Sequence, residues 1–412
     1  MADKGSSRWG IVALVFAAVM LNYVDRQILA LLKPTLEARF HWSDGDYGNM
    51  QSAFQFAAAF GFLGAGWFID RVGLRLGFGL GVAVWSLAAM AHAFASGVTG
   101  FIGARLVLGV SESVGTPGAV KSAATYFGPR ERSLALGIGN TAPNVGAIVT
   151  PLFIPALAVA FGWRAAFLTA GGLGLIWAVL WFSVRVRPVA VVAEQGTRVA
   201  WTPLLRDRRT WAIAAAKILS DQVWFFMLSW VPDMFHRLFG LPQGQLGWPV
   251  ALVYLLAACG ALTGGYLPTR LLAAGWSLNA ARKTAMLVYA LMIVPVPVVL
   301  SLTNPWAAAL VLGLGLFAHQ GFSTNVFGLA TDIVPARAVG STIGIAAFCG
   351  NLWSIGLIQL PAISMRTGLG YWPVLLICAA SYLVALGLVQ LILPRIERVE
   401  DDGSGAVAVA GH

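Results

Sequence analysis

The chain has 412 residues, of which 58% are hydrophobic and only 11% are charged. Soluble domains usually carry about 25% charged residues, so this composition excludes a water-soluble globule and predicts a surface that faces lipid. The net charge of +10 would suit a nucleic-acid partner, but the basic residues fall mainly in predicted loops on one side of a membrane, so we expect no nucleic acid.

Twelve apolar runs follow one another along the chain. Each has about 20 residues or more and can cross a hydrocarbon core of about 30 Å as a helix. The predicted spans are residues 9–31, 46–69, 76–97, 100–127, 133–160, 164–184, 211–236, 245–268, 282–302, 305–333, 338–363 and 371–394. The sequence lacks the alternation of polar and apolar residues that is typical of β-barrels. We therefore expect an all-α polytopic membrane protein with twelve transmembrane helices.

The two ends of the chain are predicted to lie in the cytoplasm. With the N-terminus inside, 18 of the 27 Lys and Arg residues fall in cytoplasmic segments, and five fall outside: Lys33, Arg39, Arg164, Arg237 and Arg366. The first apolar run has the position of a signal peptide. It is long, contains Asp25 and Arg26 and lacks a small-residue cleavage site, so we expect a retained first helix.

The longest polar stretch, Arg185 to Arg209, divides six predicted helices from six. The expected organisation is an N-terminal six-helix bundle at 1–184, a cytoplasmic linker at 185–210, a C-terminal six-helix bundle at 211–394 and a disordered cytoplasmic tail at 395–412. The loop at 66–75 has a weak echo at 265–270, which indicates an internal repeat.

Four charged residues interrupt the first and fourth predicted helices. Asp25 and Arg26 lie roughly 24–26 Å from the cytoplasmic start of the first helix, and Arg105 lies about 8 Å from the external start of the fourth, so all three are expected at similar height. Glu112 follows Arg105 by almost two turns and shares its face. A charge within a membrane helix is costly, which makes each one a candidate functional residue.

The chemistry of these four residues suits an anion and protons. A guanidinium matches the two oxygens of a carboxylate, so Arg26 and Arg105 are predicted to bind substrate. Asp25 and Glu112 can neutralise the arginines in an empty cavity and are predicted to carry coupled protons. The alternatives are a generic structural or proton-relay role for Arg105 and buried ion pairs that only fix helix packing for the others.

Helix 7 carries a second candidate group near the midplane. Asp221 is followed by Trp224, and an aromatic wall beside a carboxylate would suit a sugar ring. An i,i+4 ion pair with Lys217 and simple aromatic packing are the alternatives. Side chains that could hydrogen-bond substrate hydroxyls, or only join helices, are Gln55, Asn144, Asn351 and Ser354.

Three motifs resemble the major facilitator superfamily. They are the loop from Gly66 to Gly77, Arg105 within Ala-Arg-Leu-Val-Leu-Gly, and Gly162-Trp163-Arg164. The fold that this resemblance implies is two six-helix bundles, related by a pseudo-two-fold axis along the membrane normal, around a central cavity. In the loop, Asp70, Arg71 and Arg75 are predicted to gate the cytoplasmic side rather than to bind substrate.

A closer resemblance is to the anion:cation symporter family, especially bacterial hexuronate and sugar-acid permeases. It rests on Asn22-Tyr23-Val24-Asp25-Arg26, on Arg105 with Glu112, and on Asp221-Gln-Val-Trp224. Tyr23 thereby joins the expected substrate site. The chain departs from the pattern at Thr269, where the second signature loop has an acidic residue, and at Val114-Gly-Thr-Pro117, which fits only approximately.

These features predict a proton-coupled symporter for a sugar acid, a hexuronate or an aldonate such as glucuronate, galacturonate or galactonate, that works by alternating access. The expected partners are a small carboxylate, protons and membrane lipid, and the expected location is the bacterial cytoplasmic membrane, as a monomer. We expect no cofactor, metal or catalytic residue, since the sequence lacks a P-loop, metal-ligand spacing and a nucleophile-base set. The alternatives are a permease for an aromatic acid, a dicarboxylate or phosphate, a membrane receptor and a membrane-embedded enzyme.

Overall fold

The computed structural model describes residues 6–184 and 201–397, which are almost entirely helical. The α-helices are α1 (Ser6–Phe40), α2 (Asp44–Val72), α3 (Leu74–Ala91), α4 (Val98–Glu112), α5 (Gly115–Tyr126), α6 (Pro129–Phe161), α7 (Trp163–Ser183), α8 (Trp201–Arg206), α9 (Arg208–Phe239), α10 (Gly247–Thr263), α11 (Tyr266–Ala273), α12 (Leu278–Ile293), α13 (Pro305–Ile333), α14 (Ala336–Arg366) and α15 (Trp372–Ile392). Short 3₁₀ turns are η1 (His92–Phe94), η2 (Gln243–Gln245) and η3 (Val296–Ser301).

Twelve helical segments of the described chain are long and apolar enough to cross a membrane, which confirms the predicted number of spans. The first span is longer than expected. The apolar run was predicted to end at residue 31, whereas α1 continues to Phe40 and includes Lys33. The helix can continue past this charge because three carboxylates surround the Lys33 ammonium group.

The fourth predicted span, 100–127, consists of two helices. α4 ends at Glu112 and α5 begins at Gly115. Pro117 explains the break, because proline has no N–H for the carbonyl of Ser113 and its ring crowds that carbonyl. The eighth span is divided in the same way between α10 and α11, where Pro268 lies four residues after Gly264.

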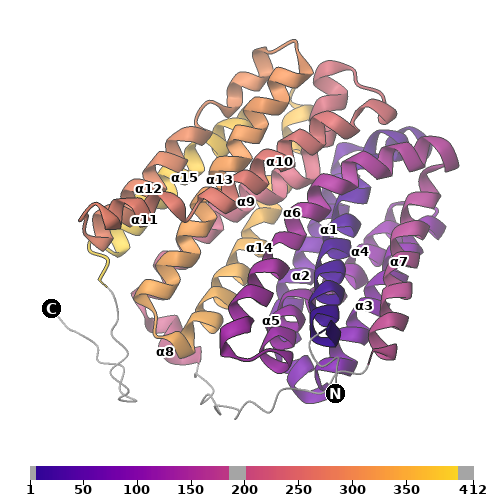
Figure 1. The fold of residues 1–412 in the computed structure, drawn as a ribbon. Helices are drawn as coiled ribbons and strands as arrows, with labels where there is room; N and C mark the ends of the chain where they lie inside the picture. Colours follow the sequence, from indigo (N-terminus) through magenta and orange to yellow (C-terminus); the bar gives the residue numbers. More distant parts are fainter. Residues whose placement is uncertain (1–5, 185–200, 398–412) are drawn as a thin grey trace.

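The helices form two bundles that lie side by side (Figure 1). Within the first bundle α1 packs on α6, α2 on α4 and α3 on α7, and within the second α9 packs on α14 and α15, and α10 on α13. The bundles meet where α2 contacts α14, α6 contacts α10 and α1 contacts α9. This arrangement confirms the expected all-α fold of two six-helix bundles.

The predicted linker and tail fall partly outside the described residues. This applies to 185–200 and 398–412, while α8 occupies 201–206 within the predicted linker and α9 starts at Arg208 rather than at 211. The division into domains at residues 1–184 and 211–394 stays a prediction.

Glycine allows α4 to approach α2 closely. A Cβ atom at Gly109 would lie 2.5 Å from the carbonyl oxygen of Phe54 and 3.1 Å from the backbone nitrogen of Ala58. Membrane helices pack through such small residues because lipid supplies no hydrophobic drive between them. The contact matters for the site because α4 carries Arg105 and Glu112.

Gly109→Val is expected to lower the free energy of unfolding by about 1–3 kcal/mol, because the added atoms overpack the contact with α2. Gly103→Val is the matched control, since it lies on the same helix and a Cβ atom there meets nothing within 4 Å. Thermal unfolding of the purified protein in detergent compares the two variants. Equal losses would show that the α2–α4 contact tolerates the larger side chain.

Candidate functional site

Four buried charges lie together in the first bundle. Asp25 and Arg26 come from α1, and Arg105 and Glu112 come from α4, which packs on α2. None of the four is more than 9% exposed. The structure therefore brings together the residues that the sequence placed in one polar column.

Arg26 and Glu112 form an ion pair between α1 and α4. The Arg26 Nε atom lies 2.8 Å from Glu112 Oε2, and the guanidinium also lies over the rings of Phe54, at 5.1 Å, and Tyr23, at 5.3 Å. Asn22 donates to the backbone carbonyl of Glu112. The other Glu112 oxygen, Oε1, has no hydrogen-bond partner among the described residues. Glu112 thus holds one arginine while keeping an acceptor free.

Arg105 has no such partner. Its side chain is 1% exposed, and none of its three guanidinium nitrogens makes a hydrogen bond within the described chain. The guanidinium lies over Phe54, 5.6 Å from the ring centroid, and the buried Asp25 Oδ1 is unpaired as well. Asp25 was expected to neutralise an arginine in the empty cavity, and it makes no hydrogen bond to one. An unpaired buried charge is costly, so a bound anion would stabilise the guanidinium of Arg105.

The second bundle contributes an ion pair and an aromatic wall. Asp221 pairs with Lys217 at 2.9 Å, the i,i+4 alternative that the sequence allowed. Trp224 stacks on His319, with ring centroids 5.2 Å apart. Helix α9 of the second bundle thus carries both the ion pair and the indole of this wall.

Amide side chains join the two bundles through hydrogen bonds. Gln55 Nε2 donates to Ser354 Oγ at 3.3 Å, and Gln320 Nε2 donates to Asn144 Oδ1 at 3.4 Å. Asn351 donates to the carbonyl of Ala347 within α14. The Gln55 Oε1 and Asn351 Oδ1 atoms are buried without a partner in the described part of the chain, so both can accept a hydrogen bond.

Two of the three residues predicted to gate the cytoplasmic side have polar partners in the structure, and these partners belong to the same bundle. Asp70 pairs with Lys121, and Arg75 donates to the carbonyl of Phe182. Arg71 is exposed. Their gating role stays a prediction.

Two aromatic residues beside Trp224 were not among the site residues predicted from the sequence. His319 stacks on Trp224, and its Nδ1 lies 2.7 Å from the Tyr382 hydroxyl. Tyr254 lies edge-on to Trp224, with its hydroxyl buried and unpaired among the described residues. The only signal in the sequence was a polar group within an apolar span.

Twelve helices long enough to span a membrane, arranged in two bundles with buried charges inside the first, are typical of a membrane transport protein. The chain belongs to the Major Facilitator Superfamily, whose family model matches residues 15–358. It is a multi-pass membrane protein of a transporter family, not an enzyme.

Known relatives and one solved structure agree with this assignment. The chain is 25% identical over 415 residues to the hexuronate transporter of Escherichia coli (strain K12), an alignment that covers 95% of each chain. It is 26% identical to the D-galactonate transporter of Escherichia coli O6:H1, over 97% of this chain and 98% of that one. Its fold is similar to that of a bacterial homologue of the human lysosomal transporter Spinster, with a TM-score of 0.79, 16% identity, and coverage of 97% of this chain and 100% of the other.

Glu112→Leu is expected to lower the free energy of unfolding by about 3 kcal/mol, because it leaves the Arg26 charge buried without its counter-ion. The double variant Arg26→Met/Glu112→Leu removes both charges and should recover most of that loss. Thermal unfolding in detergent measures both variants.

The control for these two variants is Asp70→Asn, which breaks the exposed ion pair with Lys121 in the same bundle. It should lower the free energy of unfolding by less than about 1 kcal/mol. A double variant as unstable as Glu112→Leu would show that the loss has another source than the unpaired arginine.

Proposed function

We propose that this transporter is a proton-coupled symporter of a monovalent sugar acid, a hexuronate or an aldonate, that works by alternating access. The single observation that carries the proposal is the unpaired, buried guanidinium of Arg105. The names of the two relatives, a hexuronate transporter and a D-galactonate transporter, support the same class of substrate. The proposed location is the bacterial cytoplasmic membrane, with both termini in the cytoplasm.

The carboxylate of the substrate binds Arg105 in this proposal. The three free nitrogens offer the planar set of donors that a carboxylate accepts in bidentate geometry. Phe54 covers the guanidinium and limits the directions from which an anion approaches. Substrate hydroxyls then bind the free acceptors of Gln55 and Asn351, with Ser354 and Asn144 beside them, and the sugar ring lies against Tyr23 and Trp224.

Protons are coupled through the two carboxyl groups in the first bundle. A proton on Glu112 weakens its ion pair with Arg26 and leaves Arg26 as a second cation for the substrate carboxylate. Asp25, buried and unpaired at Oδ1, is the second proton site. Protonation and substrate binding thus favour each other, because substrate and Glu112 compete for one guanidinium.

A permease for an aromatic acid is the rival proposal. The observation in its favour is the cluster of rings around Trp224, where His319 stacks on the indole and Tyr254 meets it edge-on. A flat aromatic ring would fit that wall as well as the apolar face of a sugar does.

Uptake by the purified protein in proteoliposomes separates the proposals. Labelled glucuronate, galacturonate and galactonate are offered with and without an inward proton gradient, and benzoate and glucose serve as comparison substrates. Gradient-stimulated uptake of a sugar acid that a proton ionophore abolishes is the expected result. If benzoate were taken up and none of the sugar acids were, the rival substrate would replace the proposed one.

Arg105→Lys is expected to weaken binding of the transported acid by about 10- to 100-fold, because the point charge of lysine cannot reproduce two parallel charge-assisted hydrogen bonds. Calorimetric titration in detergent measures the affinity. The control is Arg164→Lys, since Arg164 donates to the carbonyl of Ala93 at the end of its bundle, away from the central site. Wild-type affinity in Arg105→Lys would remove Arg105 from the site.

Glu112→Gln is expected to retain counterflow exchange and to lose accumulation driven by a pH gradient, because the amide can hydrogen-bond Arg26 but cannot carry the coupled proton. Both activities are measured in the same proteoliposomes. Asp207→Asn is the control, since this acid caps α9 outside the bundle core and asparagine caps equally well. Undiminished accumulation in Glu112→Gln would assign the coupling proton elsewhere.

A further inference from the structure

Helix α9 has one narrow face that the rest of the protein leaves uncovered. Among residues 210–224, those that are not buried are Trp211, Ala215, Ile218 and Leu219. Trp211, Ala215 and Leu219 are four residues apart, with Ile218 beside Leu219, so they share one side of the helix. Because α9 is long and apolar enough to cross a membrane, this exposed face of α9 meets lipid.

A groove lies at the deeper end of the exposed face, between α14 and α15. Both helices pack on α9 more than on each other, and the groove between them has a volume of about 640 Å³. Its lining includes Leu219 and Gln222 of α9, Trp353 and Gly356 of α14 and Ser381 of α15. A Cβ atom at Gly356 would meet nothing within 4 Å, so the glycine leaves the groove open.

The groove suits hydrocarbon better than water. Its lining is apolar apart from Gln222, Ser381 and the indole nitrogen of Trp353. Gln222 Nε2 donates to Ser381 Oγ at 3.0 Å, and Ser381 donates to the carbonyl of Ile377, so these polar groups are bonded within the protein. The bilayer interior supplies no water, and a groove that opens into it is filled by lipid chains.

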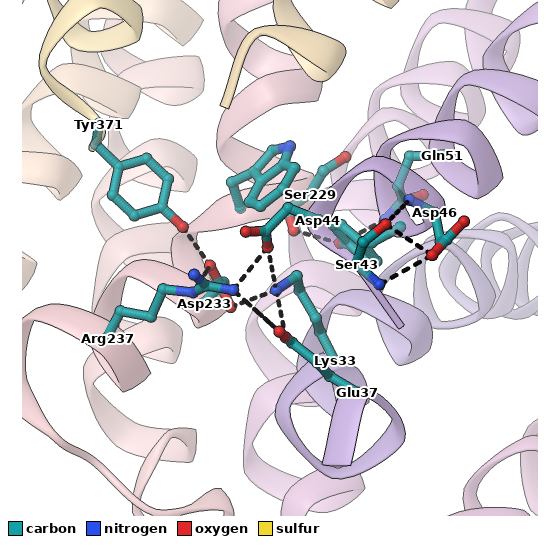
Figure 2. A network of polar contacts seen from close by, with 12 residues as sticks. Lys33, Glu37, Ser43, Asp44, Asp46, Gln51, Ser229, Asp233, Arg237 and Tyr371 are labelled. Atoms are coloured by element: carbon teal, nitrogen blue, oxygen red, sulfur yellow. Dashed lines mark hydrogen bonds and ion pairs between the residues drawn. The ribbon is translucent and has the colours of Figure 1, made fainter. Parts of the chain in front are cut away.

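Two arginines lie at the other end of the exposed face. Arg206 ends α8, Arg208 begins α9, and both side chains are exposed. Within the described part of the chain, neither guanidinium makes an ion pair or a hydrogen bond. Lys33 and Arg237, in contrast, contact several carboxylates in the cluster that Figure 2 shows. Arg206 and Arg208 can therefore both contact an anion from outside the chain.

The carboxylate between these arginines is occupied. Asp207 accepts from the backbone N–H of Arg209 and lies 3.8 Å from the Arg209 guanidinium. Residues 206–209 are three arginines and one aspartate, which leaves a net charge of +2. A basic cluster next to a membrane span attracts the headgroups of anionic lipids.

Tryptophan side chains mark the membrane surface at the same end. Trp201 and Trp211 are 48% and 44% exposed. The indole N–H of Trp211 donates to the carbonyl of Leu205, which joins α8 to α9. Tryptophan is enriched at the level of lipid headgroups. The two free arginines therefore lie at the height of a headgroup.

The distance between the arginines and the groove fits one lipid chain. From Trp211 to Gln222, α9 rises about 16 Å and turns by about 20° beyond three full turns, so both residues lie on the same side. One leaflet supplies half of a hydrocarbon core of about 30 Å, so its chains reach about 15 Å inward. A lipid held at Arg208 thus places the end of a chain in the groove.

We propose that an anionic phospholipid of the surrounding membrane binds along α9, with its phosphate at Arg206 and Arg208 and one acyl chain in the groove between α14 and α15. The positive charge selects the headgroup, and the groove holds the chain. This site lies on the side of α9 that faces lipid, whereas Asp221 and Trp224 of the same helix belong to the candidate substrate site. The inference goes beyond the proposed function and does not depend on the transported substrate.

Photo-crosslinking in proteoliposomes tests the site. The purified protein is placed in phosphatidylcholine vesicles with a trace of phosphatidylglycerol that carries a diazirine near the end of one acyl chain. A second set of vesicles carries the same chain on phosphatidylcholine. Mass spectrometry of the digested protein then measures the lipid attached to residues 352–360 and 377–384. Phosphatidylglycerol is expected to label these residues about tenfold more, because two arginines favour its charge.

The double variant Arg206→Gln/Arg208→Gln should reduce labelling by phosphatidylglycerol to the level of phosphatidylcholine. Both side chains are exposed, so the variant is expected to fold, as gel filtration checks. Arg270→Gln is the matched control, since it removes another exposed arginine of the same bundle, one that lies 4.9 Å from the ring centroid of Tyr266. Labelling in this control should equal that of the wild type.

Gly356→Phe tests the groove itself. The ring fills the space that the glycine leaves open, so labelling of the groove by either lipid should be lost. Gly103→Phe is the control, because Gly103 is also exposed and a Cβ atom there likewise meets nothing within 4 Å, but it lies on α4 of the first bundle.

Equal labelling of the groove by the two lipids, or labelling that persists in both the arginine and the Gly356→Phe variants, would overturn the site. Absence of lipid labelling together with chemical crosslinks between α15 of two copies would assign the groove to a second copy of the chain instead. The readout uses no substrate, so failure of the lipid site and failure of the sugar-acid proposal are separate results.

Discussion

The burial of charge between lipid-embedded helices is the constraint on which this structure depends. Lipid offers no hydrogen bonds, so each charge inside the bundles needs a counter-ion or a polar ligand. Arg26, Lys33 and Lys217 meet that need with carboxylates at 2.8, 2.7 and 2.9 Å. Arg105 does not, although it is equally buried. This difference is the basis of the proposal that an anion binds Arg105, whereas the paired charges join helices to one another.

Helices α1 and α9 each carry charged residues at two heights. On α1, Arg26 and Lys33 are seven residues apart, which is about 10 Å along the helix, and on α9 Asp221 precedes Asp233 by about 18 Å. Each helix therefore carries charged residues of the central site and, further along, charged residues of the cluster around Lys33. In the proposed transport cycle, a tilt of either helix changes the contacts at both places.

The candidates for the central site could be named from single residues, because a charge within an apolar run is visible in the sequence alone. Arg26, Arg105, Glu112 and Asp221 were named in this way and are buried in the structure, and the i,i+4 spacing also anticipated the pair of Lys217 with Asp221. Which carboxylate pairs with which arginine could not be predicted. That choice depends on how α1 and α4 are rotated against each other, and the structure pairs Arg26 with Glu112 and leaves Asp25 Oδ1 and Arg105 unpaired.

The sequence by itself determined the class of the molecule. The length of the apolar runs and the small share of charged residues indicated twelve membrane-spanning helices, and the motifs indicated two bundles. Only the tertiary structure decided which charges pair across the contact of the two bundles. Lys33 and Asp233 are 200 positions apart and are brought to 2.8 Å by the contact of α1 with α9. In the sequence Lys33 looked like a loop residue beyond the apolar run, since two of its three counter-ions come from other helices. A local pattern records what one helix must bury, but the partner of a buried charge is set by the packing of helices.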